Sequence, residues 1–158
     1  MGHLMPTHDE YADSNARSPI CASDILIAMC ALLLACAIWL PGIGERGLWF
    51  DEAWSAHAAS QPTLLDAFNA DATNPPLYYG LVHISGRLWG TSELGLRIPS
   101  LLGALIAGAL ALRLAWRVNE RRALVLTALC LPASGALLWA AGEARMYTLL
   151  AIGVLVCA

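Results

Sequence analysis

The chain has 158 residues, of which 58% are hydrophobic, and its mean hydropathy is +0.60. Ordinary soluble domains contain about 45–50% apolar residues, so this composition excludes a typical soluble globular protein and favours a membrane protein. The net charge of −3 combines twelve acidic residues with nine arginines and no lysine. The positions of the arginines indicate membrane topology and not a nucleic-acid partner.

The five cysteines predict neither a disulfide framework nor a metal site. Four of them lie inside apolar runs, and the sequence contains no C-x-x-C motif or Cys/His cluster. We therefore expect no metal and no cofactor. The segment 33–36 (Leu-Leu-Ala-Cys) resembles a lipoprotein cleavage site. However, the apolar run continues past Cys36 and the preceding region is acidic, so processing there is kept only as an alternative.

Apolar runs divide the chain into a tail and a series of membrane spans. Residues 1–24 are polar and without periodicity, and we expect a disordered cytoplasmic tail. Residues 25–158 form the membrane domain, and its predicted spans are about 22–40, 98–116, 123–141 and 148–158. The last run stops after half a crossing, which would leave backbone groups unpaired in lipid. We therefore expect a fragment or a truncated copy of a longer protein.

Basic residues set the expected orientation. The link between the second and third spans contains Arg113, Arg117, Arg121 and Arg122. Short loops rich in arginine stay in the cytoplasm, so the amino terminus is also expected there, whereas residues 41–96 and 143–147 are expected outside. Trp39 and Trp139 then fall at outer helix ends, as expected for an aromatic belt. All the polar motifs described below would share one face of the membrane.

The outer loop, residues 41–96, is predicted to hold three juxtamembrane helices. The first covers residues 51–60 and has carboxylates in its first turn. The second begins at Pro62 and carries apolar residues at Leu64, Leu65 and Phe68. The third begins after Asn74 as the cap, with Pro75 at the first helical position, and runs to about Trp89 before Gly90. Its length suits a helix at the membrane interface better than one that crosses it.

Polar residues in the outer segments have both structural and functional interpretations. Asp51 and Glu52 are either carboxylates that cap a helix or catalytic groups, and only one of two neighbours on a helix would face a substrate. Arg97 and Arg145 are either interfacial anchors that pair with Glu93 and Glu143 or ligands for an anion such as phosphate. Three tyrosines are interfacial residues or substrate contacts: Tyr78, Tyr79 and Tyr147.

Four motifs follow one another in a fixed order. They are Trp49-Phe50-Asp51-Glu52-Ala53, then Asn74-Pro75-Pro76-Leu77-Tyr78-Tyr79, then Ser92-Glu93 with Arg97-Ile98-Pro99-Ser100, and finally Glu143-Ala144-Arg145-Met146-Tyr147. In this order they resemble the amino-terminal part of the GT-C glycosyltransferases. The sequence is most similar to the family 39 branch, which includes protein O-mannosyltransferases and lipid A aminoarabinose transferases. The resemblance covers about residues 47–150.

The resemblance implies an all-α, multi-pass membrane protein with a truncated GT-C fold in the plasma membrane. It implies an enzyme that transfers a sugar from a polyprenyl-phosphate donor to a lipid, glycan or protein acceptor outside the cytoplasm. The family's acceptor-activating Asp corresponds to Asp51, with Glu52 as a supporting carboxylate, and its Arg at the head of the second span corresponds to Arg97. Asn74 stands where many relatives have His. The predicted substrate-binding set is completed by Arg145, Tyr147, Asn74, Tyr78 and Tyr79.

Two other functions remain open. The first is a non-catalytic remnant that keeps the front of the fold but lacks the donor contacts. The second is a small membrane scaffold or transport subunit, which should carry polar residues inside its spans. Within residues 98–116, Arg113 near the inner end is the one charged residue.

Overall fold

The computed structural model describes residues 21–72, 74–118 and 121–158, and these ranges contain helices and turns but no β-strand. In chain order the elements are α2 Ala22–Trp39, the 3-10 helix η1 Leu40–Gly42, α3 Glu52–Ala59, α4 Leu64–Phe68, α5 Pro76–Trp89, α6 Glu93–Arg117, α7 Arg121–Cys130, α8 Gly135–Ala141 and α9 Tyr147–Cys157. The all-helical prediction is confirmed. Residues 1–20 of the predicted tail lie outside the described residues, and Ala22–Asp24 already form the first turn of α2.

Two helices are long and apolar enough to cross a membrane: Ala22–Gly42, which combines α2 with η1, and α6. They match the first two predicted spans. Helix α6 begins five residues before the predicted start, because the Ser92 side chain caps it by accepting a hydrogen bond from Gly95 N–H. Pro99 lies inside α6 and has no N–H for the Gly95 carbonyl. Ser85 Oγ donates to that carbonyl at 2.5 Å, so the acceptor that the proline leaves free has a partner.

The third predicted span, residues 123–141, is not one straight helix. It is divided into α7 and α8, whose axes differ by 54°. The break follows from its residues, because Pro132 cannot continue the α7 hydrogen-bond ladder and Ser134 caps α8 by accepting from Leu137 N–H. Trp39 donates its indole N–H to the Pro132 carbonyl at 3.1 Å. Trp39 is fully buried, so its predicted place in an outer aromatic belt is wrong.

The three outer helices form where they were predicted, with shifted starts. Helix α4 begins at Leu64 and not at Pro62, because Thr63 caps it by accepting from Asp66 N–H. Helix α5 begins at Pro76 with Pro75, not Asn74, as its N-cap residue, and the Asn74 amide donates to Asp71 Oδ2 at 2.5 Å. It ends at Trp89, and the following Gly90 has a φ of +85°, which suits glycine.

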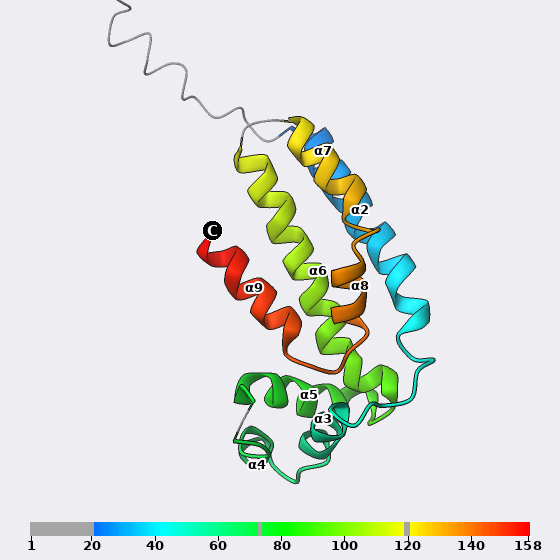
Figure 1. Cartoon of the computed structure of the whole chain (residues 1–158), viewed down its shortest axis with the longest axis vertical. Coiled ribbons are helices and arrows are strands. Elements are labelled where there is room, and N and C mark those ends of the chain that lie inside the picture. Colours follow the sequence, from blue (N-terminus) through cyan, green and yellow to red (C-terminus); the bar gives the residue numbers. More distant parts are fainter. Residues whose placement is uncertain (1–20, 73, 119–120) are drawn as a thin grey trace, which may run out of the picture.

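Helix α6 is the central element of the fold. Helices α2, α7, α8 and α9 pack along it, whereas α3, α4 and α5 gather at its amino-terminal end (Figure 1). One apolar core lies between α2, α6, α7 and α8, and a second lies between α3, α5 and α6. The loop from Gly142 to Met146 connects α8 to α9 beside that second core, where Ala144 is buried. This arrangement brings the segments around residues 50 and 145 together.

Candidate functional site

A buried ion pair joins two of the sequence-predicted site residues. The Arg97 guanidinium donates to the Glu52 carboxylate from Nε at 2.9 Å and from Nη2 at 2.6 Å. The exposed fractions of the two side chains are 1% and 0%. Such a two-point contact in a dry environment fixes the relative orientation of the helices that carry it. Here it locks the first turn of α3 onto α6.

Arg97 has no donor left for a ligand. Nη1 donates to the carbonyls of Ile43 and Arg46, each at 2.7 Å, and Nη2 donates to the Gly47 carbonyl at 3.2 Å. Together with the two bonds to Glu52, these contacts use all five guanidinium N–H groups. The predicted phosphate contact and the alternative pairing with Glu93 are therefore replaced by a structural role. Arg97 holds the loop between η1 and α3 against the head of α6.

Glu52 is the centre of this cluster. Besides Arg97, it accepts a hydrogen bond from Ala144 N–H at 2.6 Å and from Trp49 N–H at 3.0 Å. Burial raises the pKa of Glu52, but the bonds from Arg97 and the two backbone N–H groups outweigh burial and hold it below its usual range. Because Glu52 follows Asp51 and Ala144 precedes Arg145, the same carboxylate sets the positions of both neighbours.

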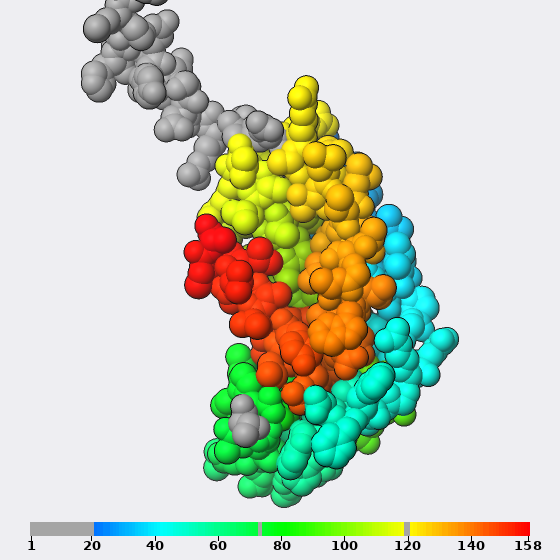
Figure 2. All heavy atoms as spheres, viewed as in Figure 1, coloured from blue at the N-terminus to red at the C-terminus, as the bar shows by residue number. Residues whose placement is uncertain are grey.

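A cavity of about 270 Å³ lies beside this cluster. It is lined by Trp49, Phe50 and Asp51 from the start of α3 and by Trp139, Glu143, Arg145 and Tyr147 from the α8–α9 region. The two segments lie side by side on one face of the molecule, the first cyan to teal and the second orange to red (Figure 2). The structure thus brings together three of the predicted site residues, namely Asp51, Arg145 and Tyr147.

Asp51 and Arg145 form a loose pair in this cavity. The distance from Arg145 Nη2 to Asp51 Oδ2 is 3.9 Å, and Arg145 Nη1 donates to the Asp51 backbone carbonyl at 3.1 Å. The Asp51 side chain is 66% exposed, whereas that of Arg145 is 14% exposed. Among the described residues, the buried Arg145 Nε has no hydrogen-bond partner. That Nε is buried, but Arg145 Nη2 also makes no hydrogen bond among the described residues and lies beside the accessible Asp51 carboxylate. Such an arrangement can bind an anion through Nη2 and accept a proton on the carboxylate.

Four residues of the cavity wall were not in the predicted site. Trp49 and Phe50 belong to the first motif but received no role, and Trp139 was expected in an aromatic belt. The Trp139 ring lies 4.9 Å from that of Tyr147, centre to centre, with 34° between the ring planes. Glu143 was expected to pair with an arginine. Glu143 makes no ion pair among the described residues and is one of the residues that line the cavity, and burial, followed by the nearby Glu52 charge, raises its pKa.

The remaining predicted site residues lie outside this cavity. Tyr78 is buried, and its hydroxyl shares a hydrogen bond of 2.8 Å with Ser100 Oγ, which contacts the Arg145 carbonyl at 3.2 Å. Burial raises the pKa of Tyr78 well above its ordinary value. Tyr79 donates to Asp71 Oδ2 at 3.0 Å, and burial raises its pKa to about 12. Asn74 lines a different surface cavity between α4 and α5.

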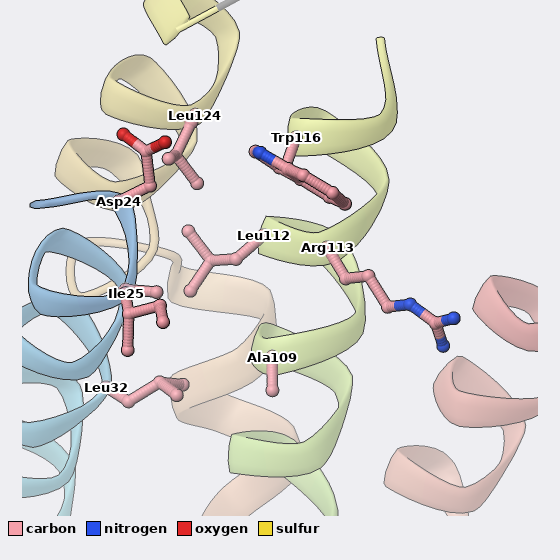
Figure 3. A pocket seen from close by; sticks show the side chains of 9 residues that line it. Asp24, Ile25, Leu32, Ala109, Leu112, Arg113, Trp116 and Leu124 are labelled. Atoms are coloured by element: carbon pink, nitrogen blue, oxygen red, sulfur yellow. The ribbon is translucent and has the colours of Figure 1, made fainter. Parts of the chain in front are cut away.

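A third crevice, of about 200 Å³, lies between α2, α6 and α7 (Figure 3). It is lined by Asp24, Ile25, Ala28, Leu32, Ala109, Leu112, Arg113, Trp116 and Leu124. The side chains that face it are apolar, and the Arg113 guanidinium points away from it, towards α9 (Figure 3). It therefore lacks the polar groups that a catalytic site needs.

Within the part of the chain that the structure describes, no cluster of three His, Cys, Asp or Glu side chains could hold a metal ion. Comparisons with protein-family models, curated proteins and solved structures found no match.

Proposed function

We propose that the chain is a membrane glycosyltransferase that moves a sugar from a polyprenyl-phosphate donor to a lipid, glycan or protein acceptor. The observation that carries the proposal is the cavity in which Asp51 and Arg145, 94 residues apart in sequence, are in contact. Its groups are those that displacement from a phosphate requires: an accessible carboxylate and a guanidinium with free donors. The order of the four motifs supports the same conclusion.

The proposal includes a multi-pass protein in the plasma membrane with its amino terminus in the cytoplasm. Two helices of membrane length and the arginine-rich segment between α6 and α7 support this arrangement. The cavity would then lie on the outer side, at the level of the lipid headgroups. A carrier embedded in the outer leaflet could present its phosphate there without leaving the bilayer.

The proposed reaction is a single inverting displacement. The acceptor hydroxyl oxygen forms a bond to the anomeric carbon while the bond from that carbon to the phosphate oxygen breaks. Asp51 takes the hydroxyl proton, and the bonding electron pair leaves with the polyprenyl phosphate, whose charge Arg145 stabilises. Of the two arginines expected as phosphate ligands, Arg97 and Arg145, the proposal assigns the role to Arg145. Glu52 is a positioning residue that holds Asp51 and Arg145 in place.

Replacement of the proposed base tests this function. In membranes from cells that express the full chain, Asp51→Asn should reduce transfer of labelled mannose from polyprenyl-phosphate mannose by about 10²–10⁴-fold, the range for loss of a general base. Asp66→Asn removes a carboxylate from α4, outside the cavity, and should leave transfer unchanged. Near-normal turnover by Asp51→Asn would remove Asp51 from the role. A wild-type chain without turnover would contradict the enzymatic proposal and favour the non-catalytic alternative.

A further inference from the structure

A groove of about 100 Å³ lies between the carboxyl-terminal ends of α6 and α9. The two helices approach each other closely at the start of α9, where Thr148 lies against Gly103. The groove and the cavity around Asp51 have no lining residue in common. The walls of the groove are four apolar side chains and two arginines: Leu110, Leu114, Leu155, Val156, Arg113 and Arg117.

The two arginines of the groove have unused hydrogen-bond donors. Among the described residues, neither guanidinium makes a hydrogen bond or an ion pair, and both side chains are exposed. Arg113 points away from the crevice beside α2 and towards α9 (Figure 3). Arg113 and Arg117 are four residues apart, so they lie on one side of α6 and about 6 Å apart along its axis. Two guanidiniums at this spacing can hold one phosphate group between them.

The position of the groove indicates a lipid as its occupant. Helix α6 is long and apolar enough to cross a membrane, and Arg113 lies one turn before its end. A charged residue at this depth is costly unless it pairs or reaches the headgroups, so it indicates a functional site. The apolar side chains beside the arginines offer contact to an acyl chain, whereas a soluble phosphate compound could not use them. A zwitterionic lipid would bring a cationic group that the two guanidiniums repel.

We propose that this groove binds an anionic phospholipid, with Arg113 and Arg117 holding the headgroup phosphate and the leucines of the groove contacting an acyl chain. In the proposed orientation the groove faces the cytoplasmic leaflet, whose surface is negatively charged. The lipid would join α9 to α6 at the end where a groove separates them. The inference goes beyond the proposed function and uses none of its residues. The alternative is that the arginines anchor the end of α6 in any headgroup layer, without lipid selectivity.

Native mass spectrometry of the full chain in detergent, with one lipid titrated at a time, tests the inference. The lipid probes are phosphatidylglycerol and a phosphatidylcholine with the same acyl chains, and the wild type should bind the first at least tenfold more tightly. Combining Arg113→Gln with Arg117→Gln should weaken phosphatidylglycerol binding by about 30-fold, because each arginine near an anionic headgroup contributes about a fivefold gain in affinity. Combining Arg121→Gln with Arg122→Gln is the matched control. It removes the same charge from α7, outside the groove, and should stay within about threefold of the wild type.

A charge-preserving variant tests the contact itself. Combining Arg113→Lys with Arg117→Lys keeps both charges but loses the two-point hydrogen bonds of each guanidinium. Its affinity for phosphatidylglycerol should fall between those of the wild type and the glutamine double variant. An affinity for phosphatidylglycerol no higher than that for phosphatidylcholine in the wild type would overturn the site and leave only anchoring.

Three further results would overturn the proposed occupant. Equal losses in the two glutamine double variants would assign binding to diffuse positive charge. Displacement of phosphatidylglycerol by an equal concentration of glycerol 3-phosphate would assign the groove to a soluble phosphate compound. A gain of at least tenfold in phosphatidylglycerol affinity after removal of residues 1–20, which contain Asp9, Glu10 and Asp13, would identify that acidic segment as the occupant.

Discussion

Two carboxylate–guanidinium pairs lie next to each other in this protein, and their environments differ completely. Glu52 and Arg97 are buried, and Arg97 has every donor engaged. Asp51 precedes Glu52, and Arg145 follows Ala144, whose N–H donates to Glu52. The Asp51 and Arg145 side chains are nevertheless 3.9 Å apart, and Arg145 Nη2 makes no hydrogen bond among the described residues. The comparison separates a pair that builds the fold from a pair that is available to a ligand. Consecutive acidic residues can therefore have unrelated roles.

The buried pair should dominate stability. Glu52→Ala leaves the Arg97 charge buried without its counter-ion, which costs about 3–5 kcal/mol. Asp51→Ala disrupts an exposed pair and should cost about 0–1 kcal/mol. Thermal unfolding in detergent, monitored through proteolysis of the outer loop, measures the loss of stability in both variants. Equal destabilisation by the two variants would remove the distinction between the pairs.

The Asp51–Arg145 pair should dominate binding of the carrier phosphate. Arg145→Gln should weaken binding of polyprenyl phosphate by about 10–150-fold, because a hydrogen bond to a charged group contributes about 1.5–3 kcal/mol. Arg87→Gln is the matched control, since Arg87 is on α5 and donates to the Pro62 carbonyl away from the cavity. Its carrier affinity should equal that of the wild type. Similar losses in both variants would indicate a general effect of positive charge and not a site.

Acid should loosen the buried pair. The folded-state pKa of Glu52 lies below its unfolded value, so its contribution to stability is full above about pH 4.3 and is lost as the pH falls through the lower folded value. Proteolysis of residues 41–51 between pH 7 and pH 3 should therefore increase at the acid end. Glu52→Gln cannot titrate, so it should lose this step. A step of the same size in Glu52→Gln would assign it to another group.

A smaller effect should follow from breaking the hydrogen-bond chain that links Tyr78 to the backbone of Arg145. The hydroxyl of Tyr78 contacts Ser100, which contacts the carbonyl of Arg145. Tyr78→Phe removes one buried hydrogen bond and should cost about 0.5–1.5 kcal/mol. Carrier binding should weaken by no more than about threefold, since Glu52 still holds the backbone at Ala144. A larger loss of affinity than of stability would give Tyr78 a direct part in binding.

Much of the fold could be predicted because its signals are local. The length and apolar composition of α2 and α6 indicated two spans, and capping and turn residues placed α3, α4 and α5 to within a few residues. The break between α7 and α8 was missed because the apolar run is continuous, although Pro132 marks it. The buried position of Trp39 could not be predicted, because its partner, the Pro132 carbonyl, is 93 residues away.

The candidate site was predicted less completely, because partner choice depends on tertiary packing. The sequence offered Glu93 and Glu143 as neighbours for the two arginines, whereas the structure pairs Arg97 with Glu52 and Arg145 with Asp51. Trp139 joins the cavity wall because α8 is a separate helix, and nothing in the apolar pattern signals that contact. The motifs identified the right segments but could not separate the residues that form the fold from those that face the cavity.

Cross-linking in intact cells tests the central claim, that Asp51 and Arg145 share one cavity on the outer side of the membrane. The native cysteines are first replaced, at Cys21, Cys30, Cys36, Cys130 and Cys157. Cysteines are then introduced as Asp51→Cys and Arg145→Cys, and a short, membrane-impermeant, thiol-reactive cross-linker is added to the medium. We expect an intramolecular cross-link before lysis. Reaction of either cysteine only after lysis, or labelling of both without a cross-link, would contradict the account.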